Sequence, residues 1–220
     1  MTREIRAVLF DLDGTVVDSA PDLAGAANDM RRARGLTDAP YDRLRAMVGA
    51  GARGLVGEAF GVVPGDEAFD ELRDEFLARY ESRMTQLTRV FGHVEPLLDA
   101  LDARSLPWGI VTNKAMRFAD PLARSLGLFD RTAVLIAGDT TPHSKPHPAP
   151  LLEAARRMRI DPADCLYVGD DLRDVQAGRA AGMSTVAVTW GYLGMGEPID
   201  AWGAHHIADE AMDVLNFLTA

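Results

Sequence analysis

Short apolar, β-prone runs recur along most of the chain and alternate with stretches of helical periodicity. Within each run the apolar residues are consecutive rather than alternating with polar ones, which is typical of strands buried on both faces. The alternation of such strands with helices predicts a doubly wound parallel sheet covered by helices, a Rossmann-like α/β core. The predicted strands are residues 5–10, 108–112, 133–137, 165–168, 185–189 and 206–208. The predicted helices are residues 94–104, 116–126, 149–158, 174–181 and 210–218.

This alternation is interrupted once, directly after the first strand. Residues 18–88 show helical periodicity and no convincing strand, and Pro21 lies where the first turn of a helix would begin. We therefore expect an α/β core made of residues 1–16 and 89–220, with an all-helical insert at residues 17–88. Open α/β sheets bind ligands beyond the C-terminal ends of their strands, so an insert at this point is placed to act as a cap.

The composition is that of a globular protein with an acidic balance. The 220 residues are 47% hydrophobic and 25% charged, with a formal net charge of −10. Nucleic-acid and membrane-surface binders normally carry a basic patch, so this balance argues against both partners. No apolar run approaches the length of a membrane span, no signal-peptide pattern is present, and the single Cys165 permits no internal disulfide. These features predict a cytoplasmic location.

Lysine is scarce in this chain, and its placement is informative. Of the 23 basic residues, only Lys114 and Lys145 are lysines. Lys114 follows the predicted strand at residues 108–112, and Lys145 lies in a segment stiffened by prolines. A lysine supplies a compact point charge for a phosphate, although a solvated surface position is the usual alternative.

Two carboxylates follow the first predicted strand, at Asp11 and Asp13. Carboxylates at the end of a buried strand are costly unless they bind something, and hard oxygen ligands of this kind suit Mg²⁺. One of them could attack as a nucleophile while the other transfers a proton. Gly14 allows the tight turn that follows. The alternative is an ordinary acidic turn, because Asp and Gly are common in turns.

Three later segments carry side chains of related chemistry. Thr112 and Asn113 end a buried strand and could bind phosphate oxygens, although an ordinary polar strand end is the alternative. Asp170 follows another buried strand and is placed to reach a metal at the same sheet edge. Asp174 could orient Lys145 or hold a metal-bound water, and Asp171 could simply cap the next helix.

Taken in order, these segments resemble the haloacid dehalogenase-like superfamily of phosphatases, including its helical cap after the first motif. The resemblance implies that Asp11 forms an aspartyl-phosphate and that Asp13 acts first as general acid and then as general base. It implies that Thr112 and Lys145 hold the transferring phosphoryl group. It also implies that Mg²⁺ is bound by Asp11, the backbone carbonyl of Asp13 and Asp170. Phosphoryl transfer depends largely on such positioning and charge neutralisation.

Within that superfamily the chain resembles the phosphoglycolate phosphatase branch. The resemblance lies in residues 11–15, 18–23, 111–114 and 168–171. Residues 170–174, 191–192 and 202–204 are also similar to the related N-acetylmuramic acid 6-phosphate phosphatases. The substrate implied first is 2-phosphoglycolate, a small phosphorylated metabolite, with N-acetylmuramic acid 6-phosphate as the alternative. Many members of the first branch carry Asn where this chain has Ala50.

Other activities and sites remain as alternatives. A phosphomutase of the same fold would use the same aspartates, and a binding module would have lost the chemistry. The phosphate-binding set is predicted to include Thr15 and Asn113. Residues 49–54 fit a dinucleotide-binding glycine pattern, but a helical pattern rather than a strand precedes them. We interpret them as a flexible cap loop, with Arg53 as a candidate substrate contact and a plain interhelical turn as the alternative. Nothing in the sequence decides between a monomer and a homodimer.

Overall fold

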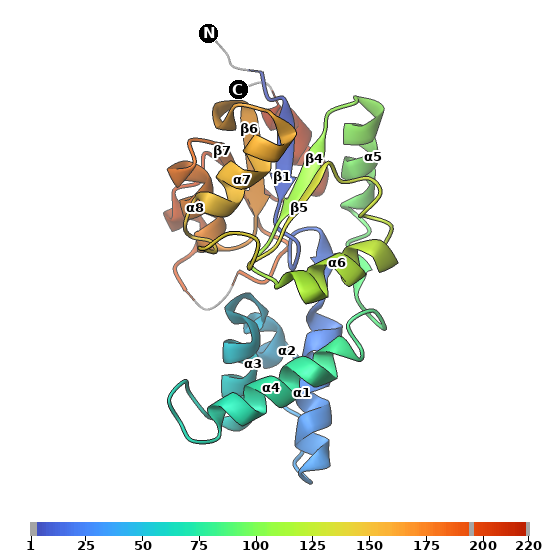
Figure 1. Ribbon diagram of the computed structural model, residues 1–220, viewed down its shortest axis with the longest axis vertical. Coiled ribbons are helices and arrows are strands. Elements are labelled where there is room, and N and C mark those ends of the chain that lie inside the picture. The colour runs from blue at the N-terminus through green and yellow to red at the C-terminus, as the bar shows by residue number, and fades with distance from the viewer. Residues whose placement is uncertain (1–3, 194–195, 219–220) are drawn as a thin grey trace. The chain divides into compact units, whose positions relative to one another are not determined.

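The computed structural model describes residues 4–193 and 196–218 (Figure 1). The chain divides into two compact units, with boundaries after Val17 and after Arg89. The first unit contains the N-terminal strand, Val90–Gly191 and the residues from Glu197 onward. The second contains Asp18–Arg89 together with a short segment that includes Tyr192 and Leu193. The sequence predicts an insert at residues 17–88, and the contribution of Tyr192 to the second unit was not predicted.

A six-stranded parallel sheet forms the centre of the first unit, as the apolar runs predict. Its strand order is β5-β4-β1-β6-β7-β8, and every residue of β1, β4, β5 and β6 is buried. Counting only these six strands along the chain, the order is 3-2-1-4-5-6, the doubly wound Rossmann arrangement. The strands are β1 (Ala7–Phe10), β4 (Trp108–Val111), β5 (Val134–Ile136), β6 (Cys165–Gly169), β7 (Ser184–Val188) and β8 (His206–Ala208).

Helices cover both faces of this sheet, because each strand presents alternate side chains to opposite sides. Helices α5 (Glu95–Ala103) and α6 (Met116–Ser125) pack on the face that presents Val8 and Phe10. Helices α7 (Ala149–Met158) and α8 (Leu172–Ala180) pack on the face that presents Leu9 and Tyr167. Two short 3₁₀ helices, η2 (Pro162–Asp164) and η3 (Ile199–Trp202), lie in the connections.

The last predicted helix, residues 210–218, is corrected by the structure. It is a 3₁₀ helix, η4 (Ala211–Phe217), rather than an α-helix. Ala211 and Val214 are buried and Phe217 is partly buried against the same apolar cluster. These residues are three positions apart, so a helix with three residues per turn brings their side chains to one face. Packing therefore favours the 3₁₀ helix over the α-helix.

The second unit is helical and has its own apolar core. Met30, Leu44, Leu55 and Phe76 are fully buried, one from each of its four helices. Asp22, buried in the first helix, accepts hydrogen bonds from the backbone N–H groups of Leu87 and Thr88 and from the Thr88 hydroxyl, which ties the two ends of the unit together. The helices are α1 (Ala20–Ala33), α2 (Tyr41–Ala46), α3 (Gly51–Phe60) and α4 (Phe69–Glu81), with η1 (Val48–Ala50) between α2 and α3.

The glycine-rich segment at residues 49–54 is not the loop that the sequence predicts. It forms the end of η1 and the first turn of α3. A Cβ on Gly54 would lie 2.5 Å from the Cβ of Ala50 and 3.0 Å from the carbonyl oxygen of Met47. Gly54 therefore serves close packing of helix against turn, whereas Gly51 provides the positive φ of 65° at the start of α3.

Tyr192 contacts the start of α1 although it comes from the far end of the chain. Its hydroxyl accepts hydrogen bonds from the backbone N–H groups of Ser19 (2.9 Å) and Ala20 (3.1 Å) and lies 3.1 Å from an oxygen of Asp18, to which it can donate. Tyr192 thus accepts from the first N–H groups at the start of α1, which have no partner within the helix, and Asp18 lies 3.4 Å from the second of them.

The two strands that link the units pair with each other. They are β2 (Val17–Asp18) and β3 (Arg89–Val90), and together they form a separate two-stranded sheet. Across the part of the chain that the structure describes, every helix is too short or too polar to cross a membrane.

Candidate active site

The candidate site lies at the C-terminal ends of β1, β4 and β6, the three central strands of the sheet. Phe10 of β1 is paired with Val168 of β6 and with Ile110 of β4, so the residues that follow these strands lie at one edge. The N–H of Asp11 extends the pairing with a 2.9 Å hydrogen bond to the carbonyl oxygen of Val168. Strand order reverses between β1 and β6, which is the position where open α/β sheets bind ligands.

Three carboxylates converge at this edge. Single oxygens of Asp11, Asp170 and Asp174 all lie within 4.8 Å of one another. Asp170 and Asp174 are 3% and 2% exposed, and the Asp11 side chain is 13% exposed. Buried carboxylates at this spacing repel one another unless cations offset their charge, and an all-oxygen set fits a hard divalent cation. The predicted metal ligands included Asp11 and Asp170; the structure adds the side chain of Asp174 to this cluster.

Lys145 places its ammonium group against two members of the acidic cluster. Its Nζ lies 2.8 Å from Asp11 Oδ1 and 2.7 Å from Asp174 Oδ1. Burial alone would lower the pKa of Lys145, but Asp11 and Asp174 outweigh that effect and raise the pKa above its ordinary value. The lysine therefore stays charged and holds Asp11 in place.

Tyr167 is a part of the site that the sequence interpretation missed. Its hydroxyl lies 2.8 Å from Lys145 Nζ, 2.9 Å from the carbonyl oxygen of Val111 and 3.1 Å from Asp174 Oδ1. Burial, followed by the charge of Asp174, raises the pKa of Tyr167 well above its ordinary value, so the hydroxyl stays protonated. A tyrosine inside an apolar strand needs a hydrogen-bond partner for its hydroxyl. This requirement could have identified Tyr167 as a site residue from the sequence.

Asp171 and Asp174 form a capping box at the start of α8. The Asp171 carboxylate accepts a hydrogen bond from the N–H of Arg173, and the Asp174 carboxylate accepts one from the N–H of Asp171. Burial and the neighbouring Asp11 raise the pKa of Asp174 to about 6, against the opposing effect of Lys145. Asp174 thus links the helix start to the lysine.

Asp13 is paired with the second lysine. Lys114 Nζ lies 3.0 Å from Asp13 Oδ1 and 2.9 Å from Asp13 Oδ2, and the Lys114 side chain is 8% exposed. The two lysines of the chain therefore contact the two aspartates of the first motif, one each. This pairing could not be read from the sequence, in which the lysines stand 101 and 134 positions from their partners.

Thr112 and Asn113 both lie at this edge, but their contacts differ. Thr112 is 2% exposed, and its hydroxyl oxygen accepts a hydrogen bond from the N–H of Lys114. The amide of Asn113 exchanges two hydrogen bonds of 2.9 Å with the backbone of Lys145. Asn113 therefore fixes the loop that carries the lysine, and its predicted contact with phosphate stays a prediction.

Two neighbouring segments support Asp170. Thr15, a predicted phosphate contact, donates a 2.8 Å hydrogen bond from its hydroxyl to Asp170 Oδ1, and its carbonyl oxygen accepts one from the indole N–H of Trp190. A Cβ on Gly191 would overlap the side chain of Asp170. Only glycine at this position lets the loop after β7 pass so close to the carboxylate.

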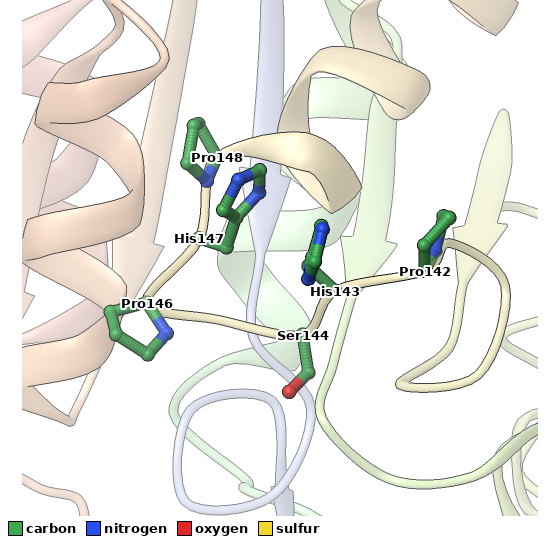
Figure 2. Close-up of a pocket in the computed structure, with 6 residues that line it drawn as sticks. All are labelled: Pro142, His143, Ser144, Pro146, His147 and Pro148. Atoms are coloured by element: carbon green, nitrogen blue, oxygen red, sulfur yellow. The ribbon is translucent and has the colours of Figure 1, made fainter.

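The outer side of the Lys145 loop forms an open hollow of about 560 Å³ (Figure 2). None of the clustered carboxylates lines it, so the hollow is distinct from the acidic site. The rings of His143 and His147 lie side by side there, with centroids 4.4 Å apart. Its lining residues are Pro142, His143, Ser144, Pro146, His147 and Pro148.

Arg53, the candidate substrate contact of the insert, lies in the first turn of α3 and is exposed. It belongs to the helical unit, and the residues of the acidic site belong to the other. Its role stays a prediction.

Comparison with known proteins agrees with this arrangement. Residues 5–182 match the family model of haloacid dehalogenase-like hydrolases. The chain is 42% identical over 214 residues to the N-acetylmuramic acid 6-phosphate phosphatase of Pseudomonas aeruginosa, covering 97% of this chain and 95% of the relative. It is 45% identical over 206 residues to the phosphoglycolate phosphatase of Xanthomonas campestris pv. campestris, covering 93% and 92%. A crystal structure described as a predicted phosphoglycolate phosphatase from Haemophilus somnus superposes with a TM-score of 0.84 at 28% identity, covering 96% and 97%.

Proposed function

The chain belongs to the haloacid dehalogenase-like hydrolase family and is a phosphatase, and we propose that it cleaves small phosphate monoesters through an aspartyl-phosphate on Asp11. The observation that carries this proposal is the ion pair between Asp11 and the buried Lys145, inside a cluster of three carboxylates. A carboxylate fixed beside a cation at a strand end is suited to in-line attack on phosphorus, because phosphoryl transfer depends mainly on positioning and charge neutralisation.

The reaction divides into two steps. In the first, a carboxylate oxygen of Asp11 attacks phosphorus, the ester bond breaks, and Asp13 gives a proton to the departing oxygen. In the second, Asp13 takes a proton from water while the water oxygen attacks phosphorus, which releases inorganic phosphate and restores Asp11. Lys145 and Thr112 hold the phosphoryl oxygens during both steps.

The acidic cluster is the proposed holder of Mg²⁺. Asp11 and Asp170 would bind the ion together with the backbone carbonyl of Asp13, and Asp174 lies close enough to hold a water of the ion. When bound, Mg²⁺ neutralises charge on the phosphoryl group and on the attacking carboxylate. The fit rests on three buried carboxylates whose oxygens lie within 4.8 Å of one another.

We propose 2-phosphoglycolate as the substrate and the cytoplasm as the location. N-acetylmuramic acid 6-phosphate is the second candidate, supported by the relative that is 42% identical over 97% of this chain. Comparing kcat/KM for these two esters, pyrophosphate and sugar phosphates would rank them. A phosphomutase would instead isomerise a sugar phosphate when a bisphosphorylated sugar activator is added.

The test of the mechanism is phosphate release from 4-nitrophenyl phosphate with and without Mg²⁺. We expect turnover that requires the metal, and a loss of at least about 1,000-fold in kcat for Asp11→Asn, because the nucleophile is removed. Full activity of Asp11→Asn would show that the proposed nucleophile is wrong. Tight binding of phosphate esters with no turnover by the unmodified protein would favour a binding module.

A further inference from the structure

We propose that Trp190 is a positioning residue for the cation site, because its hydrogen bond to the Thr15 backbone fixes the hydroxyl that orients Asp170. Through this bond Trp190 sets the affinity of the site for Mg²⁺. The inference rests on the proposed metal-dependent function and deepens it. It concerns the loop after β7, to which the mechanism above gives no role, and all the residues involved lie in the first unit.

The orientation of Asp170 depends on a hydroxyl that comes from the segment after β1. Thr15 donates a 2.8 Å hydrogen bond to Asp170 Oδ1, and the two residues are 1% and 3% exposed. Mg²⁺ requires near-ideal octahedral geometry of its oxygen ligands, so a carboxylate that can rotate is a poorer ligand than one held in place. The Thr15 hydroxyl is therefore a group through which the protein controls this ligand.

The hydroxyl of Thr15 is in turn only as fixed as the backbone that carries it. A β-branched side chain is stiff about its first torsion, so the position of the hydroxyl follows the position of residue 15 in the chain. Thr15 lies in the turn closed by the hydrogen bond from the N–H of Gly14 to the carbonyl oxygen of Val17. The Thr15 carbonyl oxygen accepts a 3.1 Å hydrogen bond from the indole N–H of Trp190, a residue 175 positions away. That bond ties the turn to the loop after β7.

Packing holds the indole of Trp190 in place to make this bond. Its ring is partly buried against the apolar core, and the ring of His93 lies nearly perpendicular to it, with centroids 5.2 Å apart. The next residue, Gly191, passes so close to Asp170 that a Cβ there would overlap the carboxylate side chain. The same loop therefore bounds the carboxylate directly and orients it through the indole.

A packing role alone is the alternative for a tryptophan in this position, and the chain offers a matched control. Trp202, which is 6% exposed, also donates its indole N–H to a backbone carbonyl, that of Glu197, at 2.8 Å. This second bond joins two residues of the connection between β7 and β8, outside the acidic cluster. Replacing either tryptophan by phenylalanine keeps an aromatic ring and removes the donor.

Calorimetric titration of Mg²⁺ into the metal-free proteins tests the inference. We expect the Kd for Mg²⁺ to rise about tenfold in Trp190→Phe, the low end of the range for groups that orient metal ligands, since Trp190 acts through Thr15. Trp202→Phe should stay within about twofold of the unmodified protein. An unchanged Kd in Trp190→Phe, or an equal rise in the two variants, overturns the inference.

A double variant identifies the route of the effect. Thr15→Val removes the hydroxyl and keeps the shape of the side chain, so it should itself raise the Kd by about 10- to 100-fold. If the indole acts through this hydroxyl, adding Trp190→Phe to Thr15→Val should raise the Kd by less than about twofold more. A further rise of about tenfold in the double variant would show that the two residues act independently, contrary to the inference.

The unmodified protein provides a measurement that does not depend on the folding of a variant at position 190. Because coupling between two events is reciprocal, saturating Mg²⁺ should slow the exchange of the Trp190 indole proton with water by about the same tenfold factor. In NMR spectra of isotope-labelled protein, the indole signals of Trp108 and Trp202 are assigned from their phenylalanine variants, which leaves that of Trp190. No slowing at Trp190, or equal slowing at Trp202, overturns the inference.

These measurements need no turnover, so they separate the inference from the proposed activity. A protein that releases no phosphate, yet binds Mg²⁺ more weakly in Trp190→Phe and not in Trp202→Phe, supports the inference and contradicts the proposed hydrolysis. An active enzyme whose Mg²⁺ affinity is the same in Trp190→Phe does the reverse. Absence of Mg²⁺ binding by the unmodified protein overturns the inference together with the proposed metal site.

Discussion

At the scale of single residues, the ammonium of Lys145 has more acceptors around it than protons to give. The acceptors are Asp11 Oδ1, Asp174 Oδ1, the carbonyl oxygen of Val111 and the hydroxyl oxygen of Tyr167. An ammonium has three protons, and the tyrosine hydroxyl adds one more. All four acceptors are satisfied when Lys145 donates to the two aspartates and to Tyr167, and Tyr167 donates to Val111. The tyrosine therefore fixes the direction of the lysine.

This arrangement predicts a catalytic effect for Tyr167→Phe. Removing the hydroxyl lets Lys145 turn toward the Val111 carbonyl, which already lies 3.0 Å away, so the fold loses only about 1 kcal/mol. We expect kcat to fall about tenfold with a smaller change in KM, because the lysine is misplaced in the reaction but still charged.

The control for this variant is Thr185→Val. Thr185 is the paired neighbour of Tyr167 on β7, and its buried hydroxyl contacts His205 rather than the site. Steady-state kinetics and thermal denaturation should show a loss of stability without a loss of kcat. Equal losses of kcat in the two variants would mean that Tyr167 acts only through the stability of the sheet.

At the scale of elements, the site depends on where strands end and on how closely their neighbours approach. The segments after β1, β4 and β6 meet because parallel strands place their C-terminal ends at one edge. The helical unit shows the same dependence on close approach. In α3, Gly54 lets the helix start pack against the turn formed by Met47 and Ala50.

The packing of α3 predicts that Gly54→Ala destabilises the protein. Alanine normally stabilises a helix relative to glycine by about 1 kcal/mol. Here its Cβ would lie 2.5 Å from the Cβ of Ala50, and overpacking costs about 1–3 kcal/mol. We expect a net loss of about 1 kcal/mol in the free energy of unfolding, measured by urea denaturation.

The double variant Ala50→Gly with Gly54→Ala tests the cause. It removes the methyl group that the new Cβ would meet, so its loss should be smaller than the sum of the two single losses. Strict additivity, or a more stable Gly54→Ala protein, would show that the segment is as mobile as its glycine content suggests.

At the scale of the whole molecule, the protein carries an excess of negative charge, part of which is concentrated in one buried cluster. Its net charge is −10, and Asp11, Asp170 and Asp174 meet beside a single lysine side chain, that of Lys145. The pKa of Asp174, about 6, lies above its ordinary value of 3.8. The folded state therefore holds a proton that the unfolded state has lost, and this group lowers stability as pH rises from about 4 to above 6.

Binding of Mg²⁺ should reverse this loss of stability. At a Mg²⁺ concentration about 100 times its Kd, the expected gain is about 2.7 kcal/mol, or a rise of about 5–10 °C in Tm. The rise should be smaller at pH 5 than at pH 7.5, because protonation of Asp174 removes negative charge from the cluster.

Thermal denaturation of Asp170→Asn provides the control. This variant should lose the response to Mg²⁺ and should be at least as stable as the unmodified protein without metal, since one repelling carboxylate is gone. An undiminished response in Asp170→Asn would place the cation elsewhere.

The sequence by itself determined the class of fold and most of the side chains that meet at the candidate site. Short runs of consecutive apolar, β-prone residues are typical of strands buried on both faces of a sheet, so the strands and the positions of Asp11 and Asp170 at their ends follow from local pattern. The predicted strand and helix limits lie within about two residues of those found, because burial and turn residues act locally.

Only the tertiary structure decided which groups touch. Lys114 contacts Asp13, Tyr167 contacts Lys145, and Asp174 joins the acidic cluster because strands distant in sequence lie side by side. The structure also differs from the prediction in two elements: the glycine-rich segment at residues 49–54 includes a helix start, and the last helix is a 3₁₀ helix. Local pattern cannot predict these features, since each depends on the neighbour against which the segment packs.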